Sequence, residues 1–325
     1  MKNNIAFFEK PKENEPWDVA IIGSGPAGLT AAIYTTRGAA STIIFAGDVW
    51  GGQLMLTTDV DNFPGFPQGI QGPDLMREMR LQAERFGAEI VNENVNQIDF
   101  TKRPFELFIN SEKYLAKTII IASGAETKWL GVPGEDKLRG RGVSSCAPCD
   151  APFFKNKKVA VIGGGDAAME ETLVLTKHAS EVTIIHRRNE FRASRVMQKK
   201  VFDNKKIKII WDSEVVEFLG DHKLEYLKIK NVKTGKVEKI DVDGAFVAIG
   251  HNPSTNIFTG KIDLDEKGYI RKMENSYKMA TNVDGVFVAG DVHDYHYRQA
   301  VTAAGYGCMA GLDALKYLEE KDQSN

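Results

Sequence analysis

Two stretches of this chain repeat each other: Asp18-Val-Ala-Ile-Ile-Gly-Ser-Gly-Pro-Ala-Gly28 and, 140 residues later, Lys158-Val-Ala-Val-Ile-Gly-Gly-Gly-Asp-Ala-Ala168. Six of the eleven positions are identical. Each copy runs from a β-branched stretch into a glycine-rich turn and then a helical segment. A further apolar stretch follows each copy, at Thr42–Phe45 and at Glu181–His186. The order strand, turn, helix, strand predicts two βαβ units with parallel, largely buried sheets.

Three more apolar stretches end in small residues, at Thr118–Gly124, Gly244–Gly250 and Gly285–Gly290. Each has the pattern of a strand that closes such a unit. Three closing strands for two glycine-rich units imply that one domain is split by the other. We therefore expect an α/β protein with two Rossmann-like domains, the first built from residues 1–127 and 254–325 and the second, inserted domain from residues 128–253.

The composition excludes several classes of protein. The 325 residues include 42 basic and 44 acidic side chains, a net charge of −2 that does not suit a polybasic nucleic-acid or membrane-surface protein. No apolar run reaches the roughly 18–20 residues of a membrane span. The N-terminal segment Met1–Pro16 is too charged for a signal peptide, and three cysteines are too few for a secreted disulfide scaffold. The sequence predicts a cytoplasmic protein without nucleic-acid or membrane partners.

The repeated turns match dinucleotide-binding motifs. Gly23-Ser-Gly25-Pro-Ala-Gly28 reads G-x-G-x-x-G, and Gly163-Gly-Gly165-Asp-Ala-Ala168 reads G-x-G-x-x-A. The first glycine permits a tight turn, the second lets the backbone approach a pyrophosphate, and the third small residue lets helix and strand pack closely. A single such turn could serve backbone geometry alone. Two copies, each between a strand and a helix, favour two dinucleotide sites.

The residues after the second strand of each unit separate the two sites. His186-Arg187-Arg188, followed by Arg192, stands where NAD-binding proteins place an acidic residue for the ribose 2′-hydroxyl. Guanidinium groups instead favour a 2′-phosphate, which they can bind with two hydrogen bonds, so NADPH is the expected coenzyme. The alternative is a solvated basic strand end. The first unit has only Phe45-Ala46-Gly47 at this position.

Cys146-Ala-Pro-Cys149 followed by Asp150 lies inside the second domain. The chain has no second CxxC pair to complete a four-cysteine zinc site, and no metal is expected. A redox-active dithiol is the stronger interpretation. Asp150 could cap a helix, or it could donate the proton that thiol–disulfide exchange consumes.

Taken together, these motifs resemble the low-molecular-weight thioredoxin reductases, from Asp18 to nearly the end of the chain. Gly51–Leu54 and Asp61–Gly65 resemble that family's flavin loops, and Gly290–Val292 with Tyr297–Ala300 resembles its C-terminal flavin signature. The resemblance implies a three-layer β/β/α fold for each domain. It assigns FAD to the first domain and NADPH to the inserted one.

The resemblance also implies a mechanism. Electrons would pass from NADPH to FAD, then to the Cys146–Cys149 disulfide, and finally to oxidised thioredoxin, the expected protein partner of a homodimer. Cys149 would be the sulfur nearer the flavin, Cys146 would attack thioredoxin, and Asp150 would supply a proton. Two departures from the family pattern, Pro148 and Ala151, affect the dithiol itself.

The expected cofactor contacts follow from the same resemblance. Asp291 would bond the ribityl chain, and Arg298–Ala300 would face the isoalloxazine. The residues expected at FAD are Gly23, Ser24, Gly25, Pro26, Ala27, Gly28, Gly47, Gly52, Gln53, Leu54, Asn62, Val95, Ala122, Gly124, Gly290, Asp291, Arg298, Gln299 and Ala300. Those expected at NADPH are Gly163, Gly165, Asp166, Ala167, His186, Arg187, Arg188 and Arg192.

Two other functions fit the same architecture. One is a dithiol oxidase that passes electrons from substrate thiols to oxygen, and the other is a flavin-dependent redox sensor. A dithiol oxidase would not need Arg187, Arg188 and Arg192, so the three arginines favour the reductase.

Overall fold

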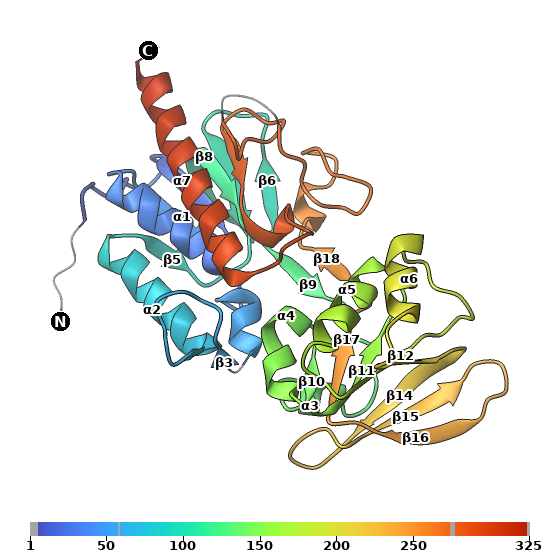
Figure 1. Cartoon of the computed structure of the whole chain (residues 1–325). Coiled ribbons are helices and arrows are strands. Elements are labelled where there is room, and N and C mark those ends of the chain that lie inside the picture. Colours follow the sequence, from blue (N-terminus) through green and yellow to red (C-terminus); the bar gives the residue numbers. More distant parts are fainter. Residues whose placement is uncertain (1–5, 58, 274–276, 324–325) are drawn as a thin grey trace. The chain divides into compact units, whose positions relative to one another are not determined.

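The computed structural model describes residues 6–57, 59–273 and 277–323, and the chain folds into two compact units. The first unit is Met1–Glu126 with Asn252–Asn325, and the second unit is Thr127–His251. Each unit contains one copy of the repeated glycine-rich turn (Figure 1).

The first unit is built around a sheet of seven strands. Its order is β5-β2-β1-β8-β7-β6, with β19 also paired to β8. The predicted parallel pairing is confirmed, because β1 pairs in parallel with β2 and β8, and β19 pairs in parallel with β8. The strands are β1 Trp17–Ile22, β2 Thr42–Phe45, β5 Glu89–Val91, β6 Gln97–Asp99, β7 Phe105–Ile109, β8 Glu112–Ile121 and β19 Val286–Val288. Two distant stretches of the chain therefore form one sheet.

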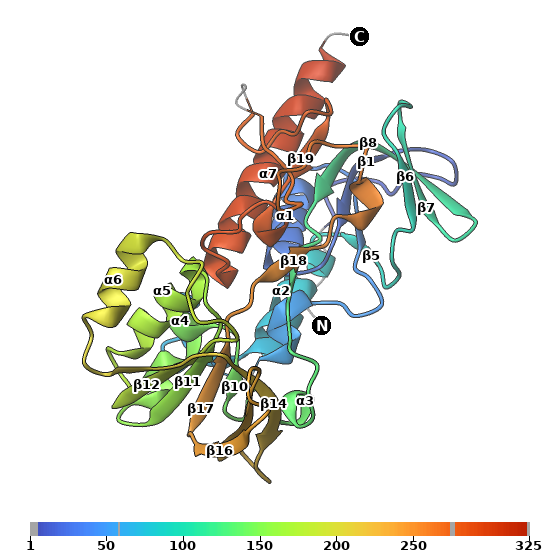
Figure 2. The same cartoon turned by 90° about the vertical axis from the view of Figure 1, so that its right-hand side faces the viewer.

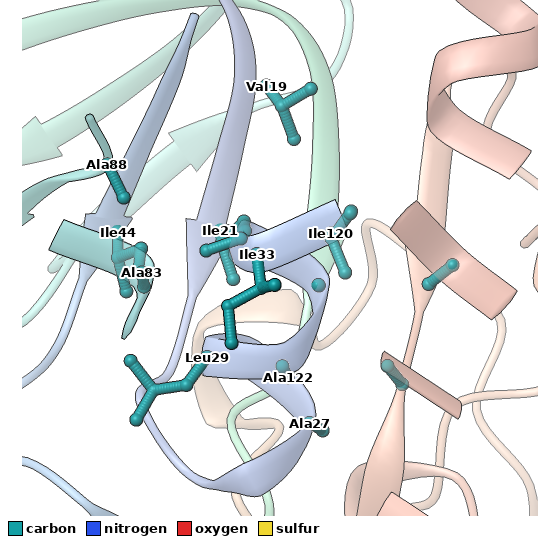
Figure 3. Close-up of a cluster of buried hydrophobic side chains, with 14 of the residues drawn as sticks. Val19, Ile21, Ala27, Leu29, Ile33, Ile44, Ala83, Ala88, Ile120 and Ala122 are labelled. Atoms are coloured by element: carbon teal, nitrogen blue, oxygen red, sulfur yellow. The ribbon is translucent and has the colours of Figure 1, made fainter. Parts of the chain in front are cut away.

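Three helices cover one face of this sheet: α1 (Pro26–Arg37), α2 (Gly72–Arg85) and α7 (Ala300–Asp322). The first helix begins directly after the glycine turn, where Pro26 fits the first helical turn because its missing N–H has no partner there in any case. Figure 3 shows Leu29 and Ile33 of α1 against Ile21 of β1, all within one apolar cluster. A second cluster, which includes Phe45, covers the opposite face.

The remaining elements of the first unit are short. They are β3 Asp59–Val60, β4 Ile70–Gln71, and the 3₁₀ helices η1 Gly52–Leu56, η3 Asn256–Phe258 and η4 Gly290–Val292.

The second unit has three layers. Its central sheet, in the order β10-β17-β11-β12-β13, is parallel throughout. Helix α5 packs on one face, and an antiparallel sheet, β14-β15-β16, packs on the other (Figure 2). The strands are β10 Val143–Ser144, β11 Lys158–Ile162, β12 Glu181–Ile185, β13 Ile207–Ile210, β14 Ser213–Leu219, β15 Tyr226–Asn231, β16 Val237–Asp241 and β17 Gly244–Val247. The predicted α/β fold class is confirmed.

The helices of the second unit are short, and α5 is the longest of those described. They are α3 Glu135–Leu138, α4 Ala147–Asp150, the 3₁₀ helix η2 Ala151–Phe154, α5 Asp166–Leu175 and α6 Arg195–Phe202.

The chain passes between the units twice, at β9 (Ala125–Thr127) and β18 (His251–Pro253), and these two strands pair with each other. Hydrogen bonds from Lys128 N–H to the Gly250 carbonyl and from Ser254 N–H to the Gly124 carbonyl flank the pair. The units divide between Glu126 and Thr127, within β9, and between His251 and Asn252, within β18.

A buried carboxylate fixes the segment that follows β9. The side chain of Glu135 accepts hydrogen bonds from the backbone N–H groups of Leu130 and Gly131, at 3.0 and 2.7 Å. Glu135 is only 1% exposed. The segment around Gly131 is therefore fixed within the second unit.

The packing of α7 on α1 yields a stability prediction. A Cβ at Gly307 would lie 2.1 Å from the carbonyl oxygen of Ala27, whereas a Cβ at Gly305 would meet nothing within 4 Å. We expect Gly307→Ala to lower the free energy of unfolding by about 1–3 kcal/mol, because the helices must move apart. The matched control Gly305→Ala should raise it by about 0.5–1 kcal/mol through helix propensity. Urea denaturation measures both, and similar effects at the two positions would contradict the packing argument.

Candidate functional site

The glycine-rich turn of the first unit joins β1 to α1 through close backbone contacts. A Cβ at Gly23 would lie 2.2 Å from the carbonyl oxygen of Ala122, and one at Gly28 would lie 2.0 Å from that of Gly23. Gly25 differs, since a Cβ there would meet nothing within 4 Å. Gly25 is the N-cap of α1, and no side chain caps this helix. The first N–H groups of α1 therefore have open space in front of them, which suits an anionic pyrophosphate.

Ser24 has a structural task in this turn. Its hydroxyl donates to the carbonyl oxygen of Ala46 at 2.8 Å and accepts from the N–H of Gly51 at 2.9 Å. Ser24 is buried. It therefore ties the turn to the chain that leaves β2.

The parallel strands gather the other predicted FAD residues at one edge of the sheet. Backbone bonds join Gly23 to Phe45, Ala122 to Ile22, and Ala289 to Ile121. Gly290, which follows β19, approaches α1 so closely that a Cβ there would be 2.8 Å from the Cβ of Ala27. The predicted residues at this edge are Gly23, Ser24, Gly25, Pro26, Ala27, Gly28, Gly47, Ala122, Gly124, Gly290 and Asp291.

Two further segments of the first unit hold predicted contacts. A Cβ on Gly52 would lie 3.5 Å from the Cα of Gly25, so η1, which contains Gln53 and Leu54, starts beside the glycine turn. The Asn62 amide donates to the side-chain oxygen of Gln299 at 3.2 Å. Val95 is buried in the apolar cluster behind the sheet, and the structure gives it no polar contact.

Asp294 shapes the segment that carries Arg298. Its carboxylate accepts backbone N–H groups of His296 at 2.9 Å, Tyr297 at 3.0 Å and Arg298 at 3.4 Å. Arg298 has a φ of 48°, a conformation that needs such support. Sequence reasoning missed Asp294, although an aspartate two to four residues before the supported N–H groups is a recognisable turn signal.

The next residue, Gln299, is the N-cap of α7 and forms a capping box with Thr302, so α7 starts at a fixed point directly after Arg298.

Burial raises the pKa of Asp291 to about 7, with a smaller contribution from Asp294, although Arg298 opposes the shift. The protonated Asp291 side chain can therefore donate as well as accept a hydrogen bond near neutral pH.

The second unit repeats this geometry. A Cβ at Gly163 would lie 2.4 Å from the carbonyl oxygen of Ala248, while one at Gly165 would meet nothing within 4 Å. Gly165 is the N-cap of α5, again without a side-chain cap. Asp166 begins α5, and its Oδ1 accepts the N–H of Ser194 at 2.8 Å. Ala167 follows it in the first turn of the helix.

Three of the four basic residues predicted at the coenzyme are exposed: Arg187, Arg188 and Arg192. None of their guanidinium groups forms an ion pair within the described part of the chain, so all three are available to an anion. His186 differs from them, because it is 6% exposed and its Nε2 lies 3.0 Å from the carbonyl oxygen of Glu190.

Cys146 and Cys149 form a disulfide, with their Cα atoms 5.4 Å apart. Cys146 is the N-cap of α4, and Pro148 lies in the first turn of that helix, where proline is well tolerated. Ala147 and Ala151 are buried in the apolar cluster under α5, so the dithiol loop is anchored to the second unit.

Asp150 ends α4 and makes no side-chain capping bond to η2. Burial raises its pKa, and a hydrogen bond with Ser144 opposes that shift. Ser144 Oγ also accepts the N–H of Cys146 at 3.0 Å, which links the carboxyl group to the dithiol loop. Of the two roles considered for Asp150, the raised pKa favours proton donation over capping.

Comparisons with known proteins agree with this geometry. Residues 17–307 match the family described as pyridine nucleotide-disulphide oxidoreductase. The chain is 52% identical over 306 residues to a thioredoxin reductase of Rickettsia conorii, which covers 93% of this chain and 98% of that protein. It is 51% identical over 324 residues to thioredoxin reductase 2 of Arabidopsis thaliana, with 95% and 84% of the two chains covered.

A solved structure gives the same result. The thioredoxin reductase of Giardia duodenalis superposes with a TM-score of 0.90 at 44% identity, covering 94% of this chain and all of that one. The chain therefore belongs to the pyridine nucleotide-disulphide oxidoreductase family and, within it, to the low-molecular-weight thioredoxin reductases. It is an oxidoreductase, and its family implies a flavin and a pyridine nucleotide. Among the described helices, none is long and apolar enough to cross a membrane.

The environment of Asp150 predicts a pH-dependent stability difference. Because its pKa in the folded protein lies above the ordinary value of 3.8, ionisation of Asp150 lowers the free energy of unfolding, starting as the pH rises above about 3.8 and reaching its full effect above the folded pKa. Asp150→Asn removes this cost and keeps a partner for Ser144. We expect the variant to melt at a higher temperature than the wild type at pH 7–8, and the difference to vanish below about pH 4. A wild type that is more stable at pH 8 would contradict this environment.

Proposed function

We propose that this chain is an NADPH-dependent thioredoxin-disulfide reductase in which FAD binds to the first unit and NADPH to the second. One observation carries the proposal. The second unit combines an open helix N-terminus, three exposed arginines that form no ion pair with any described residue, and a CxxC disulfide.

The residues present fit both dinucleotides. At Gly25 and Gly165 a Cβ would meet nothing within 4 Å, and both residues precede helices without a side-chain cap. A pyrophosphate on either helix would accept the first backbone N–H groups. The arginines distinguish the two turns, since the first unit has only Ala46 and Gly47 at the matching place. This difference supports NADPH in the second unit and FAD in the first.

Each part of the chain would have a defined task. Bound flavin supplies the hydride acceptor and the two-electron relay. The arginines bind the 2′-phosphate, and the half-buried Asp291 and the buried Asp294 of the first unit hold the polar edge of the flavin site. The dithiol, on the second unit, passes the electron pair on.

Reduction of thioredoxin by the dithiol would take two successive thiol–disulfide exchanges. The Cys146 thiolate attacks one sulfur of the thioredoxin disulfide, forms a mixed disulfide, and releases the first thioredoxin thiolate. The Cys149 thiolate then attacks Cys146, restores the intramolecular disulfide, and releases the second thiolate. Asp150, whose pKa is raised by burial, supplies a proton to a departing thiolate.

The dithiol oxidase and the redox sensor remain the alternatives. The exposed arginines favour the reductase, because an oxidase fed by substrate thiols has no use for a 2′-phosphate clamp. The homodimer and the cytoplasmic location expected from the sequence remain predictions.

Coenzyme choice tests the arginines. We expect Arg187→Gln together with Arg188→Gln to weaken NADPH binding far more than NADH binding. Each lost charge-assisted contact should cost about 1.5–3 kcal/mol. Dissociation constants from fluorescence titration measure the effect. Lys200→Gln is the matched control, since Lys200 is an exposed cation on α6. Equal losses for the two coenzymes would show that the arginines are only a solvated patch.

The assignment of the sulfurs is tested by trapping. We expect Cys149→Ser to leave Cys146 able to form a stable mixed disulfide with a thioredoxin that keeps only its attacking cysteine. Cys146→Ser should not accumulate this adduct. Non-reducing gel electrophoresis with mass spectrometry reads the result. The reverse pattern would exchange the roles of the two sulfurs and leave the reaction class intact.

A further inference from the structure

The second unit contains a segment, residues 186–194, that we call the arginine loop, and it is tied to the glycine-rich turn at three points. The N–H of Arg192 donates to the carbonyl oxygen of Gly164 at 2.8 Å. The N–H of Ser194 donates to Oδ1 of Asp166. The third tie is the ring of His186. It lies so close to Gly164 that a Cβ added to Gly164 would be 2.2 Å from a ring carbon.

The first unit also connects its glycine-rich turn to the end of its second strand, but there the connecting side chain belongs to the turn. Ser24 occupies the position of Gly164 in the repeat, and Ala46 occupies that of His186, the first residue after the second strand. There the side chain of the turn reaches the strand end, through the bond from Ser24 to the Ala46 carbonyl. In the second unit the turn has no side chain, and the side chain of the strand end reaches the turn.

His186 sits in an apolar environment that suits a structural role. Its ring centroid lies 5.5 Å from that of Phe191 and 6.2 Å from that of Trp211. Since Nε2 faces the Glu190 carbonyl, this nitrogen carries a proton and donates it.

The charged groups that face this ring are arginines. Burial lowers the pKa of His186, and Arg192 and Arg188 lower it further, although the carbonyl groups of Glu190 and Gly163 oppose the shift. The sequence suggested that His186 contacts the coenzyme directly. Its burial favours an indirect role instead.

We propose that His186 is a positioning residue for coenzyme choice: its imidazole fills the space that Gly164 leaves open and fixes the arginine loop against the glycine-rich turn. The turn would receive the pyrophosphate, and the loop would receive the 2′-phosphate. The inference rests on the proposed binding of NADPH to the second unit. NADH has no 2′-phosphate, so a displaced loop should matter little to it.

The first test measures dissociation constants of NADPH and NADH for the flavin-loaded protein. We expect His186→Ala to raise the value for NADPH by about tenfold or more, the scale of a lost charge-assisted contact, and the value for NADH by less than about twofold. His186→Gln should recover most of the loss, because its amide can donate to the Glu190 carbonyl. Thioredoxin reduction by protein pre-reduced with dithionite should be unchanged in all variants.

A double-mutant cycle tests the contact itself, with coenzyme affinity and melting temperature as readouts. Gly164→Ala should weaken NADPH binding and lower the melting temperature in the wild type, because its methyl group collides with the ring. In the His186→Ala background the same change should cost much less. Equal costs in both backgrounds would overturn the contact.

The pH profile separates positioning from direct binding. If His186 bound the phosphate as a cation, NADPH affinity would fall between pH 6 and pH 8 more steeply in the wild type than in His186→Gln. We expect parallel profiles. Unchanged coenzyme discrimination in His186→Ala would overturn this inference alone. A wild type that does not prefer NADPH to NADH would overturn the coenzyme assignment, and the inference with it.

Discussion

Backbone packed directly on backbone, with no Cβ between, is the constraint on which both units depend. At Gly28 a single methyl group would lie 2.0 Å from a carbonyl oxygen, and at Gly163 it would lie 2.4 Å from one. These contacts let each helix start directly after its strand, which leaves the helix N-terminus open beside Gly25 or Gly165. The same absence of side chains therefore sets the packing of the sheet and creates the anion site. A substitution that damages one will damage the other.

Much of the fold was predictable because its signals are local. The strand at Thr42–Phe45 was predicted with its observed bounds, and the closing strands at 118–124, 244–250 and 285–290 all proved to be strands of the parallel sheets. The antiparallel sheet at 213–241 was missed, although Leu227 and Ile229 alternate with exposed lysines in the pattern of a half-buried strand. The ordering of the segment after β9 needed tertiary information, since the Glu135 side chain accepts the N–H groups of Leu130 and Gly131 only in the folded chain.

In the candidate site, too, some residues could be predicted from local sequence and others only from the folded chain. The disulfide between Cys146 and Cys149 was predicted from residue type and spacing alone. The arginines were also named from their place at the end of a strand, and their binding of a 2′-phosphate remains a prediction. His186 and Asp294 were not understood in this way. A histidine beside two arginines suggests a third cation, and only the packing of Phe191 and Trp211 shows a buried ring. The task of Asp294 depends on three N–H groups that converge on it in the folded chain.

Because β9 pairs with β18, the second unit could be removed as a whole from the chain of the first. Because the chain leaves and re-enters the first unit on adjacent antiparallel strands, the ends of the insertion should lie only about 5 Å apart. Joining Thr127 to His251 through a short turn would close the first unit without a gap, and β19 would still reach β8, since both belong to the first sheet. The coding sequence could thus lose or exchange the second unit without interrupting the strands of the first sheet, the condition under which domains are exchanged between proteins.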